Sequence, residues 1–334
     1  MKRAHAIKRL QAMLTYCRPH GGEGEKQFVE RFIRPYEPEE IKDIAGEVLA
    51  YVVGVGKVKD APVLWCAHVD TVHTQLAPVK QTIVYDEEGG MIYKDDKIMP
   101  LGADDGAGVW MLLEMIDAGV PGTYLFHRGE ERGGIGSRAI AAQYTAFLSP
   151  HKYAIAFDRR GTGDIITEQM CGVCCSDEFA EAFAALLGMD YKPDNTGSFT
   201  DTANYINIIP ECTNVSVGYD NEHTPNETLD VWHLELLRDA VVAAFKTGIA
   251  LPVKRDPSAV VDRWGGDYRY TLSAAEVVDM PFKDIVRLVK TSSREDIAEL
   301  ILSLAEEVEH KELAEELGVN DSSYWEQADA RNRY

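Results

Sequence analysis

The sequence predicts an α/β protein in which helices cover both faces of a mixed, mostly parallel β-sheet. Helical periodicity and short apolar runs alternate from about residue 5 to residue 250 without a repeat or a low-complexity tract, and this alternation is typical of α/β domains. A chain of 334 residues is long enough for one such domain and an appendage. We therefore expect a three-layer domain over residues 1–250, followed by a linker and a helical C-terminal extension over residues 251–334.

The first half of the chain divides into elements at its glycines. A glycine turn precedes the amphipathic run at 22–33, and a Gly-Gly pair separates the two short apolar runs of a hairpin at 81–97. A terminal glycine stops the helix at 106–119. The run "APVLWCAHVD" is almost entirely apolar, as expected of a central parallel strand buried on both faces. The expected elements are an N-terminal amphipathic helix, a helix at 22–33, strands at 47–56 and 61–70, a hairpin at 81–97 and a helix at 106–119.

Three further strands are expected in the second half, and each is apolar until its last residues. Open α/β sheets bind ligands beyond the carboxyl ends of their strands, so chemistry is expected where the polar residues gather. The strands lie at 122–129, 152–160 and 212–220, and helices at about 135–146, 176–188 and 230–248 connect or cover them.

Composition excludes several classes of protein. A net charge of −21 argues against nucleic-acid binding, which needs clustered Lys and Arg. No apolar run approaches the roughly 20 residues of a membrane span, and the N-terminus "MKRAHAIKRLQAMLTYC" lacks the features of a signal peptide, so a cytoplasmic protein is expected. The "CGVCC" segment has no second ligand pair for a structural metal, and its cysteines are expected to be reduced core thiols.

Acids and histidines gather at the ends of the predicted strands and hairpin. Imidazole and carboxylate ligands suit Zn²⁺ and related divalent ions, and two such ions can share one bridging carboxylate. In the H-x-D spacing, Asp70 lies on the same side as His68 and is expected to accept a hydrogen bond from its ring, orienting it without binding metal itself. The set comprises His68, Asp70, Asp104, Asp105, Glu130, Glu131, Asp158 and His223.

Five segments carry a resemblance to a known superfamily. "AHVDTV", "LGADDGAG", "GEERGGIGS", "AFDRRGTGD" and "GYDNEHT" occur in that order, as in the di-zinc exopeptidases, which include zinc aminopeptidases, peptidase T and acetylornithine deacetylase. The resemblance covers about residues 15 to 248 and implies a zinc-exopeptidase fold with two divalent metal ions. Zinc is the expected metal, with cobalt or manganese as alternatives.

The resemblance also implies a role for each matching residue. Asp104 would bridge the two metals, His68 and Asp158 would complete one site, and Glu131 and His223 the other. Glu130 would be the general base that takes a proton from the water between the metals and passes it to the leaving nitrogen, and Asp70, which orients His68, is counted with it as a catalytic residue. The peptide bond preceding Asp105 is often cis in this superfamily.

Spacing favours the compact members of the superfamily, which have no lid domain. Only 65 positions separate Asp158 from His223 and 36 separate His68 from Asp104, and these gaps leave no room for an inserted domain. The expected function is metal-dependent hydrolysis of an amide bond in a peptide or small amide, with an aminopeptidase first. A deacylase or carboxypeptidase remains the alternative, and an inactive relative that binds a partner is a second.

Some residues are left with two interpretations. His73 and His127 line the cleft or pack in loops, and Asp201 in "NTGSFTDTANY" either faces the substrate or caps a helix. Arg159 and Arg160 either bind a substrate carboxylate or pair with structural acids. In the extension, an apolar face packs on its own domain or on a second subunit of a homo-oligomer; it comprises Ile297, Leu300, Ile301, Leu304 and Val308.

Overall fold

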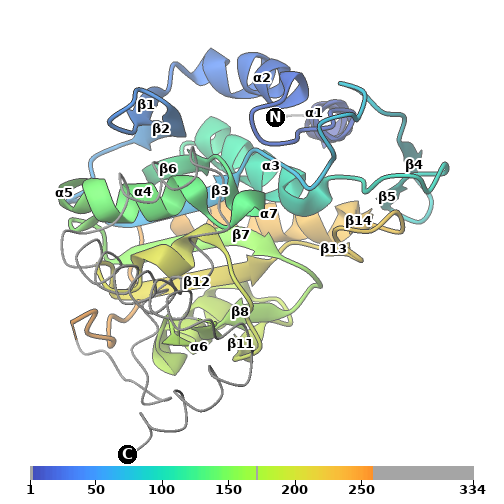
Figure 1. The fold of residues 1–334 in the computed structure, drawn as a ribbon. Helices are drawn as coiled ribbons and strands as arrows, with labels where there is room; N and C mark the ends of the chain where they lie inside the picture. Colours follow the sequence, from blue (N-terminus) through green and yellow to red (C-terminus); the bar gives the residue numbers. More distant parts are fainter. Residues whose placement is uncertain (1–2, 171, 259–334) are drawn as a thin grey trace, which may run out of the picture. The chain divides into compact units, whose positions relative to one another are not determined.

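The computed structural model of the protein describes residues 3–170 and 172–258. The predicted helical extension, with its apolar face, lies outside these residues. The described part is built around a sheet of eight strands in the order β1-β2-β6-β3-β7-β12-β8-β11 (Figure 1). The strands in that order are Glu39–Lys42, Val48–Val55, Gly122–His127, Val63–His68, Tyr153–Arg159, Glu211–Ser216, Asp164–Ile166 and Lys192–Asp194.

The centre of this sheet is parallel and its margins are antiparallel, so the predicted mixed sheet is confirmed. β3 runs parallel to both β6 and β7, and β7 runs parallel to β12. All six residues of β3 are buried, as predicted for a central strand with both faces covered. Because these four strands are parallel, their carboxyl ends lie along one edge, and His68 at the end of β3 is aligned with His127 at the end of β6.

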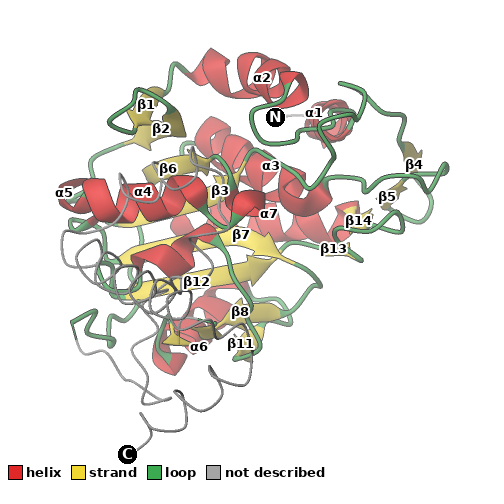
Figure 2. Ribbon diagram, viewed as in Figure 1, coloured by secondary structure: helices red, strands yellow, loops and turns green. Residues whose placement is uncertain are grey.

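Alternate residues of each central strand enter two separate apolar layers. Trp65, Tyr124 and Ile155 pack in the layer that contains α1, α3, α6 and α7, whereas Leu64, Leu125 and Ala154 pack in the layer that contains α4 and α5. Figure 2 shows the yellow strands between the red helices of these layers. The helices are α1 (Arg3–Leu14), α2 (Glu23–Phe28), α3 (Ala103–Ala118), α4 (Ile135–Gln143), α5 (Thr145–Leu148), α6 (Asp177–Leu187) and α7 (Val231–Phe245).

Glycine stops and side-chain caps define the helix ends, and the glycine stop predicted for the helix at 106–119 is confirmed. α3 stops at Gly119, whose φ of 74° is in the left-handed region that glycine adopts without cost. Ser176 accepts a hydrogen bond from the Phe179 N–H and so caps α6, and Asp230 caps α7 in the same way. A π-helix, η1 (Val29–Ile33), continues α2, so the predicted helix at 22–33 is confirmed.

A second, four-stranded antiparallel sheet lies beside the main one. The hairpin predicted at 81–97 forms its β4 (Val84–Asp86) and β5 (Met91–Tyr93); β5 pairs with β14 (Thr228–Asp230), and β14 pairs with β13 (Tyr219–Asp220). The predicted strand at 212–220 is wrong at its end, because the chain leaves the main sheet at Gly218 with a φ of 98°. Two residue pairs join β9 (Glu168–Gln169) to β10 (Gly172–Val173).

None of the helices in the described residues is long and apolar enough to cross a membrane.

Candidate active site

The polar residues predicted at the strand ends converge at the carboxyl edge of the main sheet. His68 is the last residue of β3, and Asp158 lies one position before the end of β7. Glu130 and Glu131 open a 3₁₀ turn, η3 (Glu130–Arg132), that follows β6. The other members, Asp104 and His223, come from the first turn of α3 and the loop after β13.

Asp104 lies at the centre of the cluster, with its two carboxylate oxygens directed to different partners. Oδ1 lies 3.1 Å from Nε2 of His68, and Oδ2 lies 3.0 Å from Nε2 of His223. The same nitrogen of His68 is 3.5 Å from Asp158, and that of His223 is 3.2 Å from Glu131. Asp104 therefore belongs to two groups of potential metal ligands at once.

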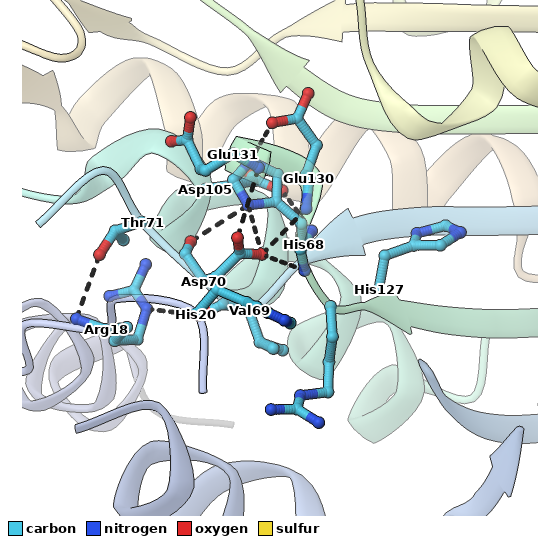
Figure 3. Close-up of polar contacts among 12 residues, drawn as sticks. Arg18, His20, His68, Val69, Asp70, Thr71, Asp105, His127, Glu130 and Glu131 are labelled. Carbon is cyan, nitrogen blue, oxygen red and sulfur yellow. Dashed lines mark hydrogen bonds and ion pairs between the residues drawn. The ribbon is translucent and has the colours of Figure 1, made fainter. Parts of the chain in front are cut away.

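Glu130 and Glu131 leave their turn in different directions (Figure 3). Glu131 reaches His223, whereas an oxygen of Glu130 lies 4.0 Å from Nε2 of His68. The strand ends before this pair, so the alternation that would send neighbours to opposite faces no longer applies. Both carboxylates can consequently face one site.

Burial and mutual charge shift the pKa values throughout the cluster. Hydrogen bonds to Asp104 and Glu131 raise the pKa of His223 to about 11. Burial opposes the charged form of His68, but the carboxylates of Asp158 and Asp104 raise its pKa well above the ordinary value. Burial raises the pKa of Glu130 well above its usual range. The buried acids of the cluster therefore favour positive charge at this site, from protonated imidazoles or from bound cations.

Asp70 is fully buried beneath this cluster and holds the turn of the two glutamates. Its Oδ1 accepts hydrogen bonds from the backbone N–H groups of Gly129 (2.9 Å) and Glu130 (3.2 Å), and Oδ2 accepts one from Glu131 (3.3 Å). Nδ1 of His68 is bonded to the backbone carbonyl of Asp70 at 3.1 Å, while the Asp70 carboxylate is 3.6 Å away. Asp70 therefore orients the His68 ring chiefly through its main chain.

The peptide bond between Asp104 and Asp105 is cis, as the resemblance implied. Asp105 points away from the two ligand groups: its carboxylate accepts the backbone N–H groups of His68 (3.1 Å) and Gly108 (2.9 Å). Glu227, which the sequence analysis did not single out, accepts those of Gly102 (2.9 Å) and Asp104 (3.0 Å). The backbone that carries Asp104 is thereby fixed from two sides.

Arg18 is a second residue missed from the sequence. Its side chain is completely buried and donates from Nε to the carbonyl of Val69 (2.8 Å) and from Nη2 to that of Gly102 (3.0 Å). The N–H of Arg18 donates to the hydroxyl of Thr71 (Figure 3). A basic residue in a loop carries no sequence signal for such a role, but its guanidinium joins the two backbone segments that present His68 and Asp104.

Asp158 is also held by residues that the sequence analysis left aside. The hydroxyl of Thr200 donates to its Oδ2 at 2.7 Å, and that of Tyr219 to its Oδ1 at 3.2 Å. The Asn214 side chain bonds both the N–H and the carbonyl of Asp158. These donors leave the carboxylate oriented toward His68.

The two uncertain histidines are packing residues. His73 is buried and bonded to Thr71 (2.7 Å) and to the carbonyl of Pro100 (3.0 Å). His127 is buried between the hydroxyl of Tyr205 (2.7 Å) and the carboxylate of Asp201 (3.3 Å), and burial lowers its pKa to about 3. Asp201 is buried, does not line the cleft and is the first residue of η4 (Asp201–Tyr205), whose N-cap is Thr200, so it is not a helix cap.

The residues fit divalent metal ions. One ligand atom each from His68, Asp104 and Asp158 lie within 4.8 Å of one another, and the same is true of Asp104, Glu131 and His223. Oε1 of Glu131 is buried and lies 3.2 Å from Nε2 of His223, so one cation can take both atoms as ligands. Mixed imidazole and carboxylate donors are the set that zinc and its neighbours take.

Together, the fold and this site define a metal-dependent hydrolase. A model of peptidase family M28 matches residues 48–240, more than half of the chain and a range that includes the whole cluster. The chain therefore belongs to peptidase family M28 and is a metallo-exopeptidase. No curated protein matches the chain.

Solved structures share the fold at low sequence identity. The aminopeptidase PepT of Bacillus cereus is 15% identical, with a TM-score of 0.59, over 74% of this chain and 99% of that chain. A tripeptidase of Staphylococcus aureus is 15% identical, with a TM-score of 0.57, over 74% and 98%. The TET1 peptidase of Pyrococcus horikoshii is 18% identical, with a TM-score of 0.54, over 72% and 99%. The predicted zinc-exopeptidase fold is thus confirmed.

Proposed function

We propose that the protein is a two-metal aminopeptidase that removes N-terminal residues from peptides. The observation that carries this proposal is the position of Asp104, whose two oxygens face two different pairs of ligands, His68 with Asp158 and His223 with Glu131. Such an acid is the bridging ligand that a two-metal site needs. Zinc is the proposed metal, and cobalt or manganese would suit the same donors.

The protein's own residues would carry the proton transfers. Two bound metal ions would polarise the scissile carbonyl and acidify the attacking water. Glu130 faces the same cleft as Asp104 and Asp158, where it would take the proton of the attacking water and deliver it to the leaving nitrogen. Asp70 would hold the Glu130 backbone at the distance this transfer requires, through the three N–H groups that it accepts.

Chelation tests the dependence on metal. Treatment with a chelator should abolish hydrolysis of peptides by the protein, and addition of zinc or cobalt should restore it, because the buried acids cannot acidify a water without the cations. Metal analysis of the active protein should give two ions per chain. Activity that survives complete removal of metal would contradict the proposal.

The scissile bond is tested by blocking the peptide ends. A deacylase or carboxypeptidase would use the same metal set, and fold analogy does not choose among these activities. The metal-loaded protein is incubated with free, N-blocked and C-blocked peptides, and the products are identified by mass. Trimming only from free N-termini supports the aminopeptidase, whereas hydrolysis of N-blocked peptides supports the alternative.

The similar structures support a peptide substrate and self-association. They are an aminopeptidase, a tripeptidase and a TET1 peptidase that can assemble into a tetrahedron or a large octahedral shell. For this chain we propose a peptide substrate, a homo-oligomer and a cytoplasmic location.

A further inference from the structure

The cleft beside the proposed metal site contains cationic side chains that hydrolysis itself does not require. It encloses about 90 Å³, which is room for several water molecules and so for the end group of a peptide. Its lining includes Asp104, Glu130 and Asp158 on one side and Arg159, Arg160 and Glu222 elsewhere. Because the chain has a net charge of −21, the two arginines are expected to pair with acids, either of the protein or of a ligand.

Arg159 is occupied by the protein. Its Nε lies 3.3 Å from Asp164 Oδ2, and its Nη2 donates to the hydroxyl of Thr196 at 3.0 Å. Asp194 is a further acid at 3.8 Å. With 13% of its side chain exposed, Arg159 serves as a structural link between β8 and the segment after β11.

Arg160 differs from its neighbour in both exposure and pairing. Its side chain is 58% exposed, and a single contact from Nη1 to Oε1 of Glu222 at 3.2 Å is its hydrogen bond within the described ranges. A guanidinium carries five donors in a planar fork, so most of them remain available on the side of the cleft. Glu222 accepts one hydrogen bond from the guanidinium and leaves its other donors available for a ligand.

We propose that Arg160 binds a carboxylate of the substrate, which makes short peptides with a carboxylate in reach of Arg160 the preferred class; this inference rests on the function proposed above. The carboxylate would come from an acidic side chain or from the C-terminus of a very short peptide. Arginine matches carboxylate geometry with two parallel hydrogen bonds. The acids of the cleft and the negative charge of the whole chain would otherwise disfavour such a substrate.

Binding of uncleavable ligands tests the inference. The probes are dipeptide analogues with a methyleneamine in place of the peptide bond, compared by calorimetry on the metal-loaded full chain. One pair differs in a C-terminal carboxylate or carboxamide, and the other in a Glu or Gln side chain. We expect the wild-type protein to bind the acidic member of at least one pair about 10- to 100-fold more tightly, and Arg160→Gln to lose that preference.

Two further variants test whether the preference depends on the shape of the Arg160 side chain and on its position in the cleft. Arg160→Lys keeps the charge but not the fork, so it should retain only part of the preference. Lys59→Gln removes an exposed cation at the opposite end of β3 and should retain all of it. Thermal unfolding of Arg160→Gln should match that of the wild-type protein, because the side chain is largely exposed.

The outcomes are distinct from those of the proposed function. Equal affinity of the wild-type protein for both members of each pair, no binding of any analogue, or an unchanged preference in Arg160→Gln would overturn the role of Arg160. The pair that shows the preference identifies the source of the carboxylate. Failure to hydrolyse any free peptide would contradict the aminopeptidase, while the binding comparison would still decide the inference about Arg160.

Discussion

Neighbouring glutamates in this protein have different environments. Glu131 lies 3.2 Å from His223 and so belongs with the proposed metal ligands. Oε2 of Glu130 lies 4.0 Å from Nε2 of His68, which is too far for a direct hydrogen bond. Glu130 also lines the cleft of about 90 Å³, so a water molecule in the cleft can lie beside it, as a general base requires.

Replacing Glu130 by Gln should nearly abolish turnover. The amide keeps the size of the side chain but cannot accept the proton, and a general base contributes about 10²- to 10⁴-fold. Steady-state kinetics and metal analysis of the purified variant measure the two quantities. Metal content should remain that of the wild-type protein, whereas the matched variant Glu131→Gln should lose metal. An active Glu130→Gln protein would refute the assignment.

His73 should make the protein less stable in acid. Burial, followed by the charge of Arg18, lowers the pKa of His73 to about 4. Below its ordinary pKa of about 6.5, the unfolded chain binds a proton that the folded chain does not, so the free energy of unfolding decreases as the pH falls.

The His73→Asn variant isolates this contribution. Between pH 7 and pH 4 the wild-type protein should lose about 3 kcal/mol more unfolding free energy than the variant, an order-of-magnitude figure from the shift. Denaturant unfolding at several pH values measures the difference. Parallel pH profiles for the two proteins would show that His73 is not kept neutral by the fold.

At the scale of elements, the turn η3 depends on one buried carboxylate. Asp70 accepts three backbone N–H groups from Gly129, Glu130 and Glu131, although it lies about 60 residues away in sequence. Without Asp70, the N–H of Gly129 would be buried without a partner, at a cost of about 1–3 kcal/mol, and the part-buried N–H groups of Glu130 and Glu131 would lose their acceptor. The turn that carries the two glutamates is therefore held in place by a residue from a distant part of the sequence.

Asp70→Asn should displace this turn. An amide offers one acceptor oxygen and turns a donor toward the remaining N–H groups, so the position of Glu130 should change. We expect kcat/KM to fall by about 10- to 100-fold, as is typical for groups that orient a metal site. Asp60→Asn, at an exposed position on the loop before β3, is the control and should have wild-type kinetics. Full activity of Asp70→Asn would exclude the anchoring role.

At the scale of the molecule, we propose a catalytic domain over residues 1–250 with an extension after it. Contacts near residue 250 predict how far the chain can be shortened before the domain loses stability. Glu211 accepts hydrogen bonds from the backbone N–H groups of Lys254 and Arg255, and the hydroxyl of Tyr153 donates to the carbonyl of Leu251. The first residues of the extension therefore complete the surface of the main sheet.

Two shortened chains test this arrangement. A chain of residues 1–258 should keep metal binding and peptide hydrolysis, because it retains every contact described here. A chain of residues 1–250 should unfold several degrees lower, because loss of the contacts of Glu211 costs about 2 kcal/mol. Thermal unfolding of both proteins measures the effect. Equal midpoints would mean that residues 251–258 do not stabilise the domain.

Much of the fold is predictable because its signals are local. Helix periodicity, caps and glycine stops indicate α3, α6 and α7, and continuous apolarity indicates β3 as a central strand. The strands β1, β8 and β11 escape prediction because each has only three or four residues, and β11 consists of Lys192, Pro193 and Asp194. Their pairing depends on neighbours from distant parts of the chain.

By itself the sequence determined which side chains gather at the carboxyl edge of the sheet, because parallel strands must end on the same side and their polar residues stand at those ends. The tertiary structure alone decided how they are held. Arg18 contacts Gly102 across 84 positions, and Glu227 contacts it across 125. No periodicity relates such residues, because buried backbone groups take whichever partners the packed chain brings within hydrogen-bond distance.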